Sequence, residues 1–505
     1  MDKVKQFFPF LAWFPMDGAT IRADLVAGIT VALVLIPQSM AYAQLAGLPA
    51  YFGLYASFLP VMVAALWGSS KQLGTGPVAV VSLLTAVAVG AALQSQLPKI
   101  GVSSIDAMTQ EQLIEFYVPL AVLLALLVGL FQLTLGVLKL GVVVNFLSHP
   151  VIVGFTNAAA MVIGLSQLNK IFGVSKERSD FFLGDIWGVL QQIGATHWET
   201  LVMGVLAFVI MMGTKKYLPK LPGVLMAVAV TTLLSWGLDF QGMGGAVVGS
   251  IPEGLPTIKV PTINLEVLGI LFTSAIVISM VGFMEAISIA KAMAAKTKDK
   301  VDPNQELIGQ GLGNIVGSFS QAYPASGSFS RSAVNLNAGA KTGMSSVYTA
   351  ALVVITLLFL TPLLYHLPKA VLAAVIMMAV IGLINFKAFK HAWIANKHDG
   401  VASVVTFVAT LGFAPHLDKG IMIGALLALG LYLYSTMKPR VAILGRYADG
   451  TLRDIRVHDL PQDNRIVVLR FDGSLYFANV SYFEEAVLEA LCARPDVKYF
   501  LVVGD

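Results

Sequence analysis

The sequence predicts an all-α polytopic membrane protein with a short α/β segment at its C-terminal end. Three observations lead to this fold class. The chain of 505 residues is 57% hydrophobic and only 12% charged, with a mean hydropathy of +0.78. Apolar runs of about 20 residues, long enough to cross a bilayer as helices, recur from Ala23 to Tyr434. After Tyr434 the sequence reads as a water-exposed α/β segment. Strands of a membrane barrel would instead alternate in polarity.

Apolar windows and glycine and proline breaks together predict fourteen membrane-spanning segments. They divide into two groups of seven, so we predict two repeats of opposite orientation, at about residues 20–238 and 267–437. The membrane domain is therefore expected to cover residues 1–437. The predicted segments are residues 23–45, 51–68, 75–93, 117–137, 147–168, 199–214, 222–238, 267–290, 305–320, 327–340, 346–365, 369–384, 400–415 and 420–436.

The distribution of basic residues predicts the orientation of the chain. With both termini on the cytoplasmic side of a cell membrane, the inner connections are richer in lysine and arginine than the outer ones, most densely between Lys291 and Lys300. The first 20 residues lack a small-residue cleavage site, so no cleavable signal peptide is expected. The net charge of +4 comes without a basic stripe interleaved with aromatic residues, which argues against a nucleic-acid partner. The single cysteine, Cys492, excludes a disulfide within the chain.

Two of the predicted spans are interrupted, and they occupy matching positions in the two halves. Gly74–Pro77 opens the apolar run that begins at Val78, and residues 324–331 open the run that begins at Ser332. A helix that starts inside the membrane has unpaired N–H groups and about half a positive charge at its first turn. Two such starts that meet near the middle of the bilayer would bind an anion. The alternative is that both are ordinary kinks of membrane helices.

Arg331 lies in an otherwise almost uncharged span. An ionised side chain there costs about 2.5–3.5 kcal/mol or more unless an anion, a carboxylate or water compensates it. Ser328 and Ser330 would add hydroxyl donors beside it on the first helical turn, a set that suits an oxyanion or a halide. The alternative is an arginine that is permanently paired with an acidic residue and joins two helices.

Glu285 is the candidate partner of Arg331, because the sequence indicates that it is the only acidic residue deep in the second half. Its protonation could be coupled to anion binding, so that an anion and a proton move together. The alternative is a fixed Glu285–Arg331 pair that transports no proton.

The first predicted span contributes polar groups next to a proline. Pro37 frees a backbone carbonyl one turn earlier, and Gln38 and Tyr42, four residues apart, share a helix face. They are candidates for a side wall of the anion site, the alternative being hydrogen bonds between helices. Asn145, His149 and Asn157 are better explained as polar packing groups. No metal-spaced histidines, nucleophile elbow or phosphate-binding loop occurs, so we expect neither an enzyme nor a cofactor or metal site.

Residues 438–505 are predicted to form part of a cytoplasmic α/β domain. We expect a strand at Ile466–Phe471, a hairpin-like turn at Asp472–Gly473, a helix at Tyr482–Leu491 that begins with a capping box of Ser481 and Glu484, and a strand at Tyr499–Val503. Two strands and one helix make an incomplete sheet, so the segment is expected to be a truncated domain.

Several long motifs, in order along the chain, resemble those of the sulfate permease (SulP) family, called solute carrier family 26 in animals. The resemblance runs from about residue 20 to the end, and residues 469–479 resemble the start of that family's STAS domain. The motifs are residues 24–28, 36–43, 47–49, 53–55, 74–79, 327–335 and 338–342.

This resemblance implies a fold of fourteen helices in a seven-plus-seven inverted repeat, with a mobile core domain and a gate domain, a homodimer, and elevator-like alternating access for small inorganic or organic anions. It also implies a site between the first, third, eighth and tenth helices. The matching substrate-binding positions are Gln38, Tyr42, Pro77, Val78, Ser328, Phe329, Ser330 and Arg331, with Glu285 as the coupling residue.

The resemblance leaves open whether the anion is sulfate, bicarbonate, chloride, oxalate or a dicarboxylate. We expect a secondary active transporter of a sulfate-like oxyanion, bicarbonate or dicarboxylate, coupled to protons through Glu285. The alternatives are sodium-coupled bicarbonate transport, a nucleobase carrier of the same fold, and a membrane-anchored signalling protein that acts through its STAS-like segment. A nucleobase carrier would be expected to offer paired carboxylates rather than an arginine.

Overall fold

The computed structural model describes residues 8–100, 102, 105, 108–141, 148–175, 181–218, 221–461 and 465–504. Asn145 lies outside the described residues. The chain divides into two compact units, Met1–Gly424 and Ala425–Asp505. The division falls inside the helix α21 (Leu417–Met437), so the second unit contains half of this helix in addition to the α/β segment.

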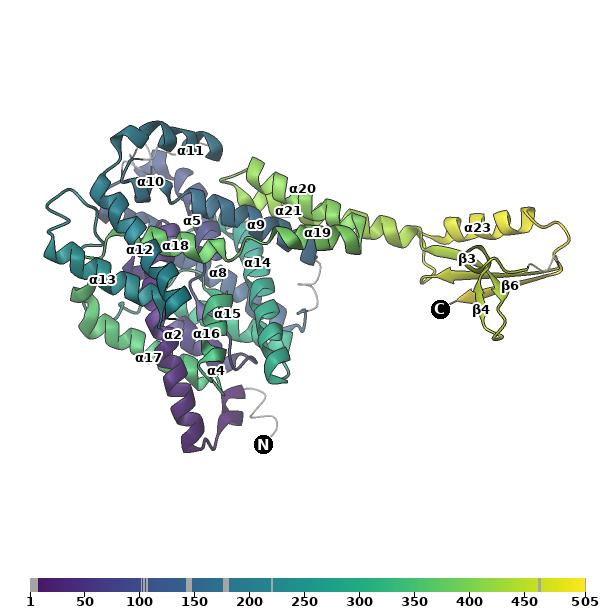
Figure 1. Cartoon of the computed structure of the whole chain (residues 1–505), viewed down its shortest axis with the longest axis horizontal. Coiled ribbons are helices and arrows are strands. Elements are labelled where there is room, and N and C mark those ends of the chain that lie inside the picture. Colours follow the sequence, from purple (N-terminus) through teal and green to yellow (C-terminus); the bar gives the residue numbers. More distant parts are fainter. Residues whose placement is uncertain are drawn as a thin grey trace. The chain divides into compact units, whose positions relative to one another are not determined.

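The first unit is built almost entirely from helices (Figure 1). Its elements up to residue 237 are η1 (Pro9–Trp13), α2 (Gly18–Leu45), α3 (Tyr51–Tyr55), α4 (Leu59–Trp67), β1 (Gly74–Gly76), α5 (Ala79–Gln94), α6 (Leu97–Ile100), α7 (Gln110–Gln112), η3 (Leu113–Tyr117), α8 (Val118–Val137), α9 (His149–Leu165), α10 (Leu168–Phe172), α11 (Phe182–Gln191), η5 (Gln192–Ala195), α12 (Trp198–Tyr217) and α13 (Gly223–Gly237). The later elements are α14 (Leu265–Thr297), α15 (Pro303–Phe319), β2 (Ser326–Ser328), α16 (Phe329–Asn337), α17 (Met344–Ile355), η6 (Thr356–Leu360), η7 (Thr361–Leu364), α18 (Lys369–Ile381), α19 (Phe386–Ala395), α20 (Lys397–Gly412) and α21.

Helix fills most of each of the fourteen predicted spans. Among the described residues, eight helical segments are long and apolar enough to cross a membrane, and three shorter helices are also apolar. The protein is therefore a mostly helical, polytopic membrane protein, while the number of fourteen crossings stays a prediction. The eight segments are Gly18–Leu45, Leu113–Val137, His149–Phe172, Trp198–Tyr217, Leu265–Thr297, Met344–Leu364, Lys369–Ala395 and Leu417–Met437.

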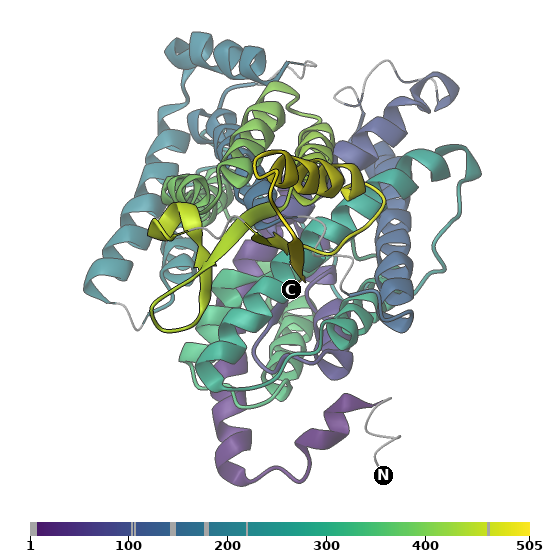
Figure 2. The ribbon, with the colours of Figure 1, turned by 90° about the vertical axis from the view of Figure 1, so that its right-hand side faces the viewer.

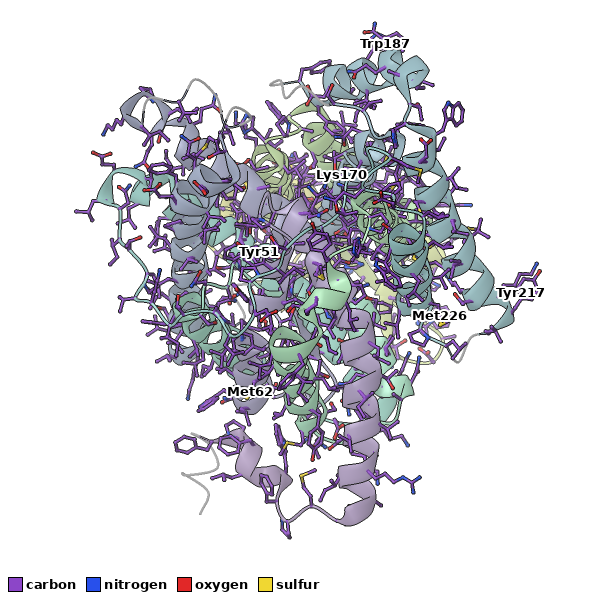
Figure 3. All side chains as sticks on the ribbon, turned by 90° about the vertical axis from the view of Figure 1, so that its left-hand side faces the viewer. Tyr51, Met62, Lys170, Trp187, Tyr217 and Met226 are labelled. Atoms are coloured by element: carbon purple, nitrogen blue, oxygen red, sulfur yellow. The ribbon has the colours of Figure 1, made fainter. Side chains whose placement is uncertain are left out.

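Helix α12 has an exposed apolar face that is suited to contact with a lipid bilayer. Its apolar side chains at 202, 205, 209 and 212, three or four residues apart, form one face and are 48–62% exposed. Trp198 and Tyr217 stand at the two ends of this 20-residue helix and are 69% and 73% exposed. Figure 3 shows the Tyr217 side chain directed away from the helices. A helix of this length spans about 30 Å, and aromatic residues at both of its ends are typical of the membrane–water interfaces.

Helix α15 packs against α4 on one side and α8 on another, with glycines at the contacts. A Cβ atom on Gly309 would lie 2.5 Å from the backbone nitrogen of Gly68, which precedes β1. A Cβ atom on Gly311 would lie 2.6 Å from the backbone nitrogen of Leu133 in α8. Backbone therefore meets backbone on both sides of α15, and close packing of this kind leaves the helix little freedom to shift.

The second unit contains a sheet, drawn in yellow in Figure 2. This sheet has four strands in the order β4-β3-β5-β6. Strand β3 pairs antiparallel with β4 and β5, whereas β5 pairs parallel with β6. The helix α23 connects β5 to β6 and packs against β5. The elements are β3 (Arg440–Arg446), β4 (Leu452–Asp454), α22 (Ile455–His458), β5 (Ile466–Asp472), α23 (Val480–Cys492) and β6 (Tyr499–Gly504).

The predicted strands and helix of this unit are confirmed within two residues, but three details are wrong. Strands β3 and β4 were not predicted. Residues 472–473 make no hairpin, because β5 continues to a parallel strand through α23. The predicted capping box is absent, because α23 begins at Val480, one residue before Ser481, with Asn479 as its N-cap. The Asn479 side chain instead donates hydrogen bonds to the carbonyls of Thr436 and Ser474.

Candidate functional site

The two interrupted segments lie side by side. Strands β1 and β2 pair antiparallel, with Gly74 opposite Ser328, Thr75 opposite Gly327, and Gly76 opposite Ser326. All six residues are buried. Helix α5 begins three residues after β1, and α16 begins directly after β2. The prediction that the two segments meet is thus confirmed, and the helix starts differ only in detail: Val78 is the N-cap of α5, and α16 begins at Phe329 rather than at Ser332.

Arg331, on the first turn of α16, is completely buried. Its Nε and Nη2 atoms have no hydrogen-bond partner among the described residues, and Nη1 donates only a long bond of 3.5 Å to Oε1 of Gln38. A Cβ atom on Gly76, whose φ is +140°, would lie 3.2 Å from Nη2, so the glycine gives the guanidinium its space beside β1. Buried polar groups are almost always satisfied. A guanidinium left this free is available to a ligand.

The serines around the start of α16 have separate tasks. Ser332 Oγ accepts from the Gly74 backbone N–H at 2.8 Å and donates to the Ser328 carbonyl at 2.7 Å, which braces β1 against α16. Ser328 Oγ and Ser330 Oγ are 3.2 Å apart. Ser328 is buried, whereas Ser330 is exposed and Phe329 is 54% exposed. No side chain caps α16 at its N-cap Ser328, so the first N–H groups of the helix are not occupied by a cap.

The predicted wall residues come to the same place from α2 and α5. Pro37 lies inside α2, which continues to Leu45. Gln38 and Tyr42 are buried, and Gln38 is the residue that reaches Arg331. Pro77 is buried and Val78 is extended, so both form the turn between β1 and α5. The structure therefore brings Gln38 to the guanidinium and places Pro77 and Val78 at the start of α5.

Glu285 lies on α14 at the level of the strand pair. One turn earlier, the Gly282 carbonyl accepts a hydrogen bond of 2.7 Å from Ser326 Oγ in β2. The next residue, Ala286, is the close neighbour of Gly327. Glu285 and Arg331 act on one another electrostatically but form no ion pair within 4.0 Å, and Glu285 accepts no hydrogen bond from the described residues. The fixed ion pair considered above is therefore not present.

Sequence reasoning missed a set of polar side chains on α15. Glu306, Gln310 and Asn314, spaced four residues apart and each at most 2% exposed, face the strand pair and the loop before it. Glu306 accepts hydrogen bonds from the backbone N–H groups of Ser69 and Ser70 at 2.9 and 3.0 Å. Glu285, which is only partly buried, is thus not the only acidic residue in the interior of the second half. The signal was available, since a polar stripe with a period of four marks the interior-facing side of a membrane helix.

Comparison with known proteins identifies the family of the chain. The sequence model of the sulfate permease family matches residues 21–406 of the chain. The chain belongs to the sulfate permease family. Sulfate transporter 4.1, chloroplastic, of Arabidopsis thaliana is 38% identical over 499 residues, which cover 97% of this chain and 70% of that protein. High affinity sulfate transporter 2 of Stylosanthes hamata is 33% identical over 508 residues, which cover 97% of this chain and 73% of that protein.

Solved structures of other transporters share the fold of the chain. The overall structure of SLC26A9 superposes with a TM-score of 0.87 at 25% identity and covers 98% of this chain and 78% of that one. The transmembrane domain of the cyanobacterium bicarbonate transporter BicA superposes with a TM-score of 0.65 at 20% identity and covers 82% and 99% of the two chains. This second likeness concerns the fold alone.

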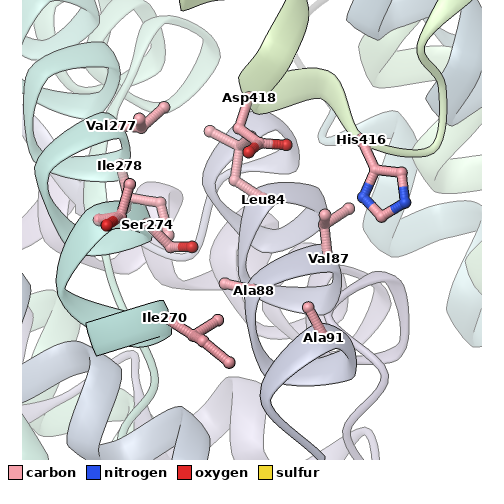
Figure 4. Close-up of a pocket in the computed structure, with 11 residues that line it drawn as sticks. Leu84, Val87, Ala88, Ala91, Ile270, Ser274, Val277, Ile278, His416 and Asp418 are labelled. Carbon is pink, nitrogen blue, oxygen red and sulfur yellow. The ribbon is translucent and has the colours of Figure 1, made fainter. Parts of the chain in front are cut away.

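This sulfate permease family member also has a cavity of about 180 Å³ between α5, α14 and the start of α21 (Figure 4). Leu84 and Ala88 of α5 and Ile270 and Val277 of α14 line it, and all four are labelled in the figure. His416 and Asp418 line it too, and Oδ1 of Asp418 is buried with no hydrogen-bond partner in the part of the chain that the structure describes. Helix α5 follows the interrupted segment β1, and α14 contacts β2. These two helices border the cavity on one side, and the start of α21 borders it on the other.

Asn157 is buried and has the predicted role of a polar packing group, whereas His149 is exposed. Asn157, on α9, donates to the Val153 carbonyl at 2.8 Å and accepts from the Asn385 backbone N–H at 2.7 Å. It therefore links α9 to the start of α19. His149 is the first residue of α9.

Proposed function

We propose that this protein is a secondary anion transporter, not an enzyme, and that it carries sulfate or a small anion of similar charge. The observation that carries the proposal is the completely buried Arg331 with two unpartnered nitrogen atoms. It lies where two buried strands lead into the first turns of α5 and α16. Helix N-termini and a guanidinium together favour an oxyanion through backbone N–H groups and charge-assisted hydrogen bonds.

Sulfate is the first choice because the relatives of highest similarity given above are named sulfate transporters. The binding residues in this proposal are Gln38, Tyr42, Pro77, Val78, Ser328, Phe329, Ser330 and Arg331, with proton coupling through Glu285. Sodium-coupled bicarbonate transport is the alternative within the same family. Uptake of labelled sulfate, bicarbonate and fumarate into proteoliposomes, with and without pH and sodium gradients, tests both. Uptake of none of these anions by the wild-type protein would reject the proposal.

We further propose fourteen spans in a seven-plus-seven inverted repeat, with core and gate domains, elevator-like alternating access and a homodimer. The supporting observations are the helix in every predicted span and the pairing of the two interrupted segments, one from each half. We also propose that both termini lie on the cytoplasmic side of a cell membrane and that residues 438–505 form part of a STAS domain.

Filling the cavity of Figure 4 tests the alternating-access proposal. Leucine at position 88 adds three carbon atoms to a buried alanine that lines the cavity. Burying them stabilises this conformation over others by about 2 kcal/mol, at about 0.8 kcal/mol for each methylene. Since a bias of this size shifts a two-state equilibrium by more than tenfold, Ala88→Leu is expected to slow sulfate uptake about tenfold in proteoliposomes.

Sulfate affinity of Ala88→Leu should stay within twofold of the wild type, because no residue of the anion site is changed. Ala229→Leu on the exposed face of α13 is the matched control and should leave uptake unchanged. Wild-type uptake by Ala88→Leu would contradict the proposal that alternating access changes the volume of this cavity.

Deleting residues 438–505 separates transport from signalling. The deletion removes the sheet and α23 but keeps α21 whole. The first compact unit ends at Gly424, before the deleted residues, and is therefore kept intact. The truncated protein is expected to bind sulfate with an affinity within threefold of the full chain, measured with labelled sulfate on purified protein. Loss of all binding by a folded truncated protein would favour the signalling alternative.

A further inference from the structure

The Asn314 side chain forms hydrogen bonds with the backbone directly before β2, in the way that a neighbouring strand would. Its Oδ1 accepts from the Ala325 N–H at 2.8 Å, and its Nδ2 donates to the Ala325 carbonyl at 3.1 Å. Ala325 directly precedes β2, and Arg331 follows six residues later. Both backbone groups of one residue are thus held by one side chain.

The Asn314 amide is itself anchored. Nδ2 also donates to Oε1 of Gln132 on α8 at 3.1 Å, and both side chains are 2% exposed. The amide therefore ties the segment before β2 to α8 as well as to its own helix. In such a buried network, removing one partner leaves the others unsatisfied, which costs more than an ordinary hydrogen bond is worth.

Gln310, one turn before Asn314, holds the other strand. Its Nε2 donates to Oγ1 of Thr75, the central residue of β1, at 2.9 Å. Both attachments start from α15, the helix that meets α4 and α8 backbone to backbone through Gly309 and Gly311. One tightly packed helix, α15, thus holds both strands that lead into the proposed anion site.

We propose that Asn314 is a positioning residue that fixes the α16 N-terminus and Arg331 in the anion site. The inference rests on the proposed function, because it assigns Asn314 a task in anion binding. Asn314 is separated from the anion by β2 and acts through Arg331. Its two bonds to Ala325 keep β2 in register with β1, and this register sets where the guanidinium lies relative to the start of α5.

A double-mutant cycle on sulfate affinity tests this role. Asn314→Ala is expected to weaken sulfate binding about tenfold, and to change the ratio of the sulfate and thiosulfate affinities at least threefold. In an Arg331→Ala background the same change should alter sulfate affinity less than twofold. An Asn314→Ala protein with wild-type affinity, or with the same loss in both backgrounds, would overturn the inference.

Ser318→Ala is the matched control, because Ser318 lies one turn further along the same face of α15, is equally buried and bonds only to its own helix. It should change neither the affinity nor the ratio. If Asn314→Ala does not fold, Asn314→Asp replaces it, since aspartate keeps the acceptor for the Ala325 N–H but loses the donor.

A second measurement needs no anion. The free and exposed Cys492 is first replaced by serine. Ser330→Cys then places a thiol on the first turn of α16, where a neutral maleimide reports on the position of this turn. Its labelling rate is expected to change at least fivefold on Asn314→Ala and to stay unchanged on Ser318→Ala. An unchanged rate in the Asn314 variant would overturn the inference even if sulfate is the wrong ligand.

Discussion

Arg331→Ala is expected to weaken sulfate binding by about tenfold to a hundredfold. A hydrogen bond to a charged group contributes about 1.5–3 kcal/mol, and every 1.4 kcal/mol is a factor of ten in affinity. Arg331 is completely buried, and its Nε and Nη2 atoms are not used by the protein. The loss should therefore appear in the dissociation constant of labelled sulfate and in the half-saturation concentration of uptake.

The same variant should remain folded. A buried arginine of purely structural function would be paired with a carboxylate, and its removal would leave that carboxylate uncompensated at a cost of about 3–5 kcal/mol. Arg331 forms no ion pair with any described residue, so its replacement breaks no ion pair. We expect a melting temperature no lower than that of the wild type by more than a few degrees.

Two further variants make this result specific. Arg331→Lys keeps the charge but loses the planar fork of the guanidinium, so its affinity should lie between those of the wild type and the alanine variant. Arg22→Ala removes an equal charge from an exposed position at the start of α2 and should have no effect. Wild-type sulfate affinity in a folded Arg331→Ala protein would remove the basis of the proposed function.

The meeting of the interrupted segments could be predicted because their causes are local. The closely spaced glycine, proline and serine residues at 74–77 and 324–328 favour a break in a membrane helix through the local sequence alone. Their matching positions in two halves that the sequence predicts to be of opposite orientation imply that they meet. The strand register could not be predicted in this way. It depends on contacts between residues more than 200 positions apart, such as Gly74 with Ser332 and Gln310 with Thr75.

The polar face of α15 was missed for a different reason. A hydropathy window treats Gln310 and Asn314 as residues that weaken a short span, because it contains no information about which side of the helix faces protein. In the structure both side chains lie against β1 and the residue before β2, where their hydrogen bonds offset the cost of burial. Glu306 was missed for the same reason. Its carboxylate accepts four hydrogen bonds, which distinguishes it from Glu285.

Glu285→Gln is expected to remove the pH dependence of sulfate uptake. A carboxylate at the level of the anion site repels the anion until it takes up a proton, so uptake by the wild type should rise as the outer pH falls from 7.5 to 5.5. Glutamine has nearly the same shape as the protonated form and cannot ionise. Uptake by the variant should therefore be nearly constant over this range and should not respond to a pH gradient, while sulfate binding persists because Arg331 is unchanged.

The comparison of three carboxylates makes this expectation specific. Glu285 interacts electrostatically with Arg331 but accepts no hydrogen bond from the described residues. The carboxylate of Glu306, in contrast, accepts hydrogen bonds from the Ser69 and Ser70 backbone N–H groups. Glu266, at the exposed start of the same helix, is paired with Lys99 at 2.6 Å. Glu266→Gln is therefore the matched control, and its pH profile should equal that of the wild type. If Glu285→Gln instead kept the pH profile and lost a stimulation by sodium, Glu285 would couple the anion to sodium. Glutamine removes the charge of Glu285 and keeps the size of its side chain. An unaltered response of Glu285→Gln to both gradients would therefore assign the coupling to another residue.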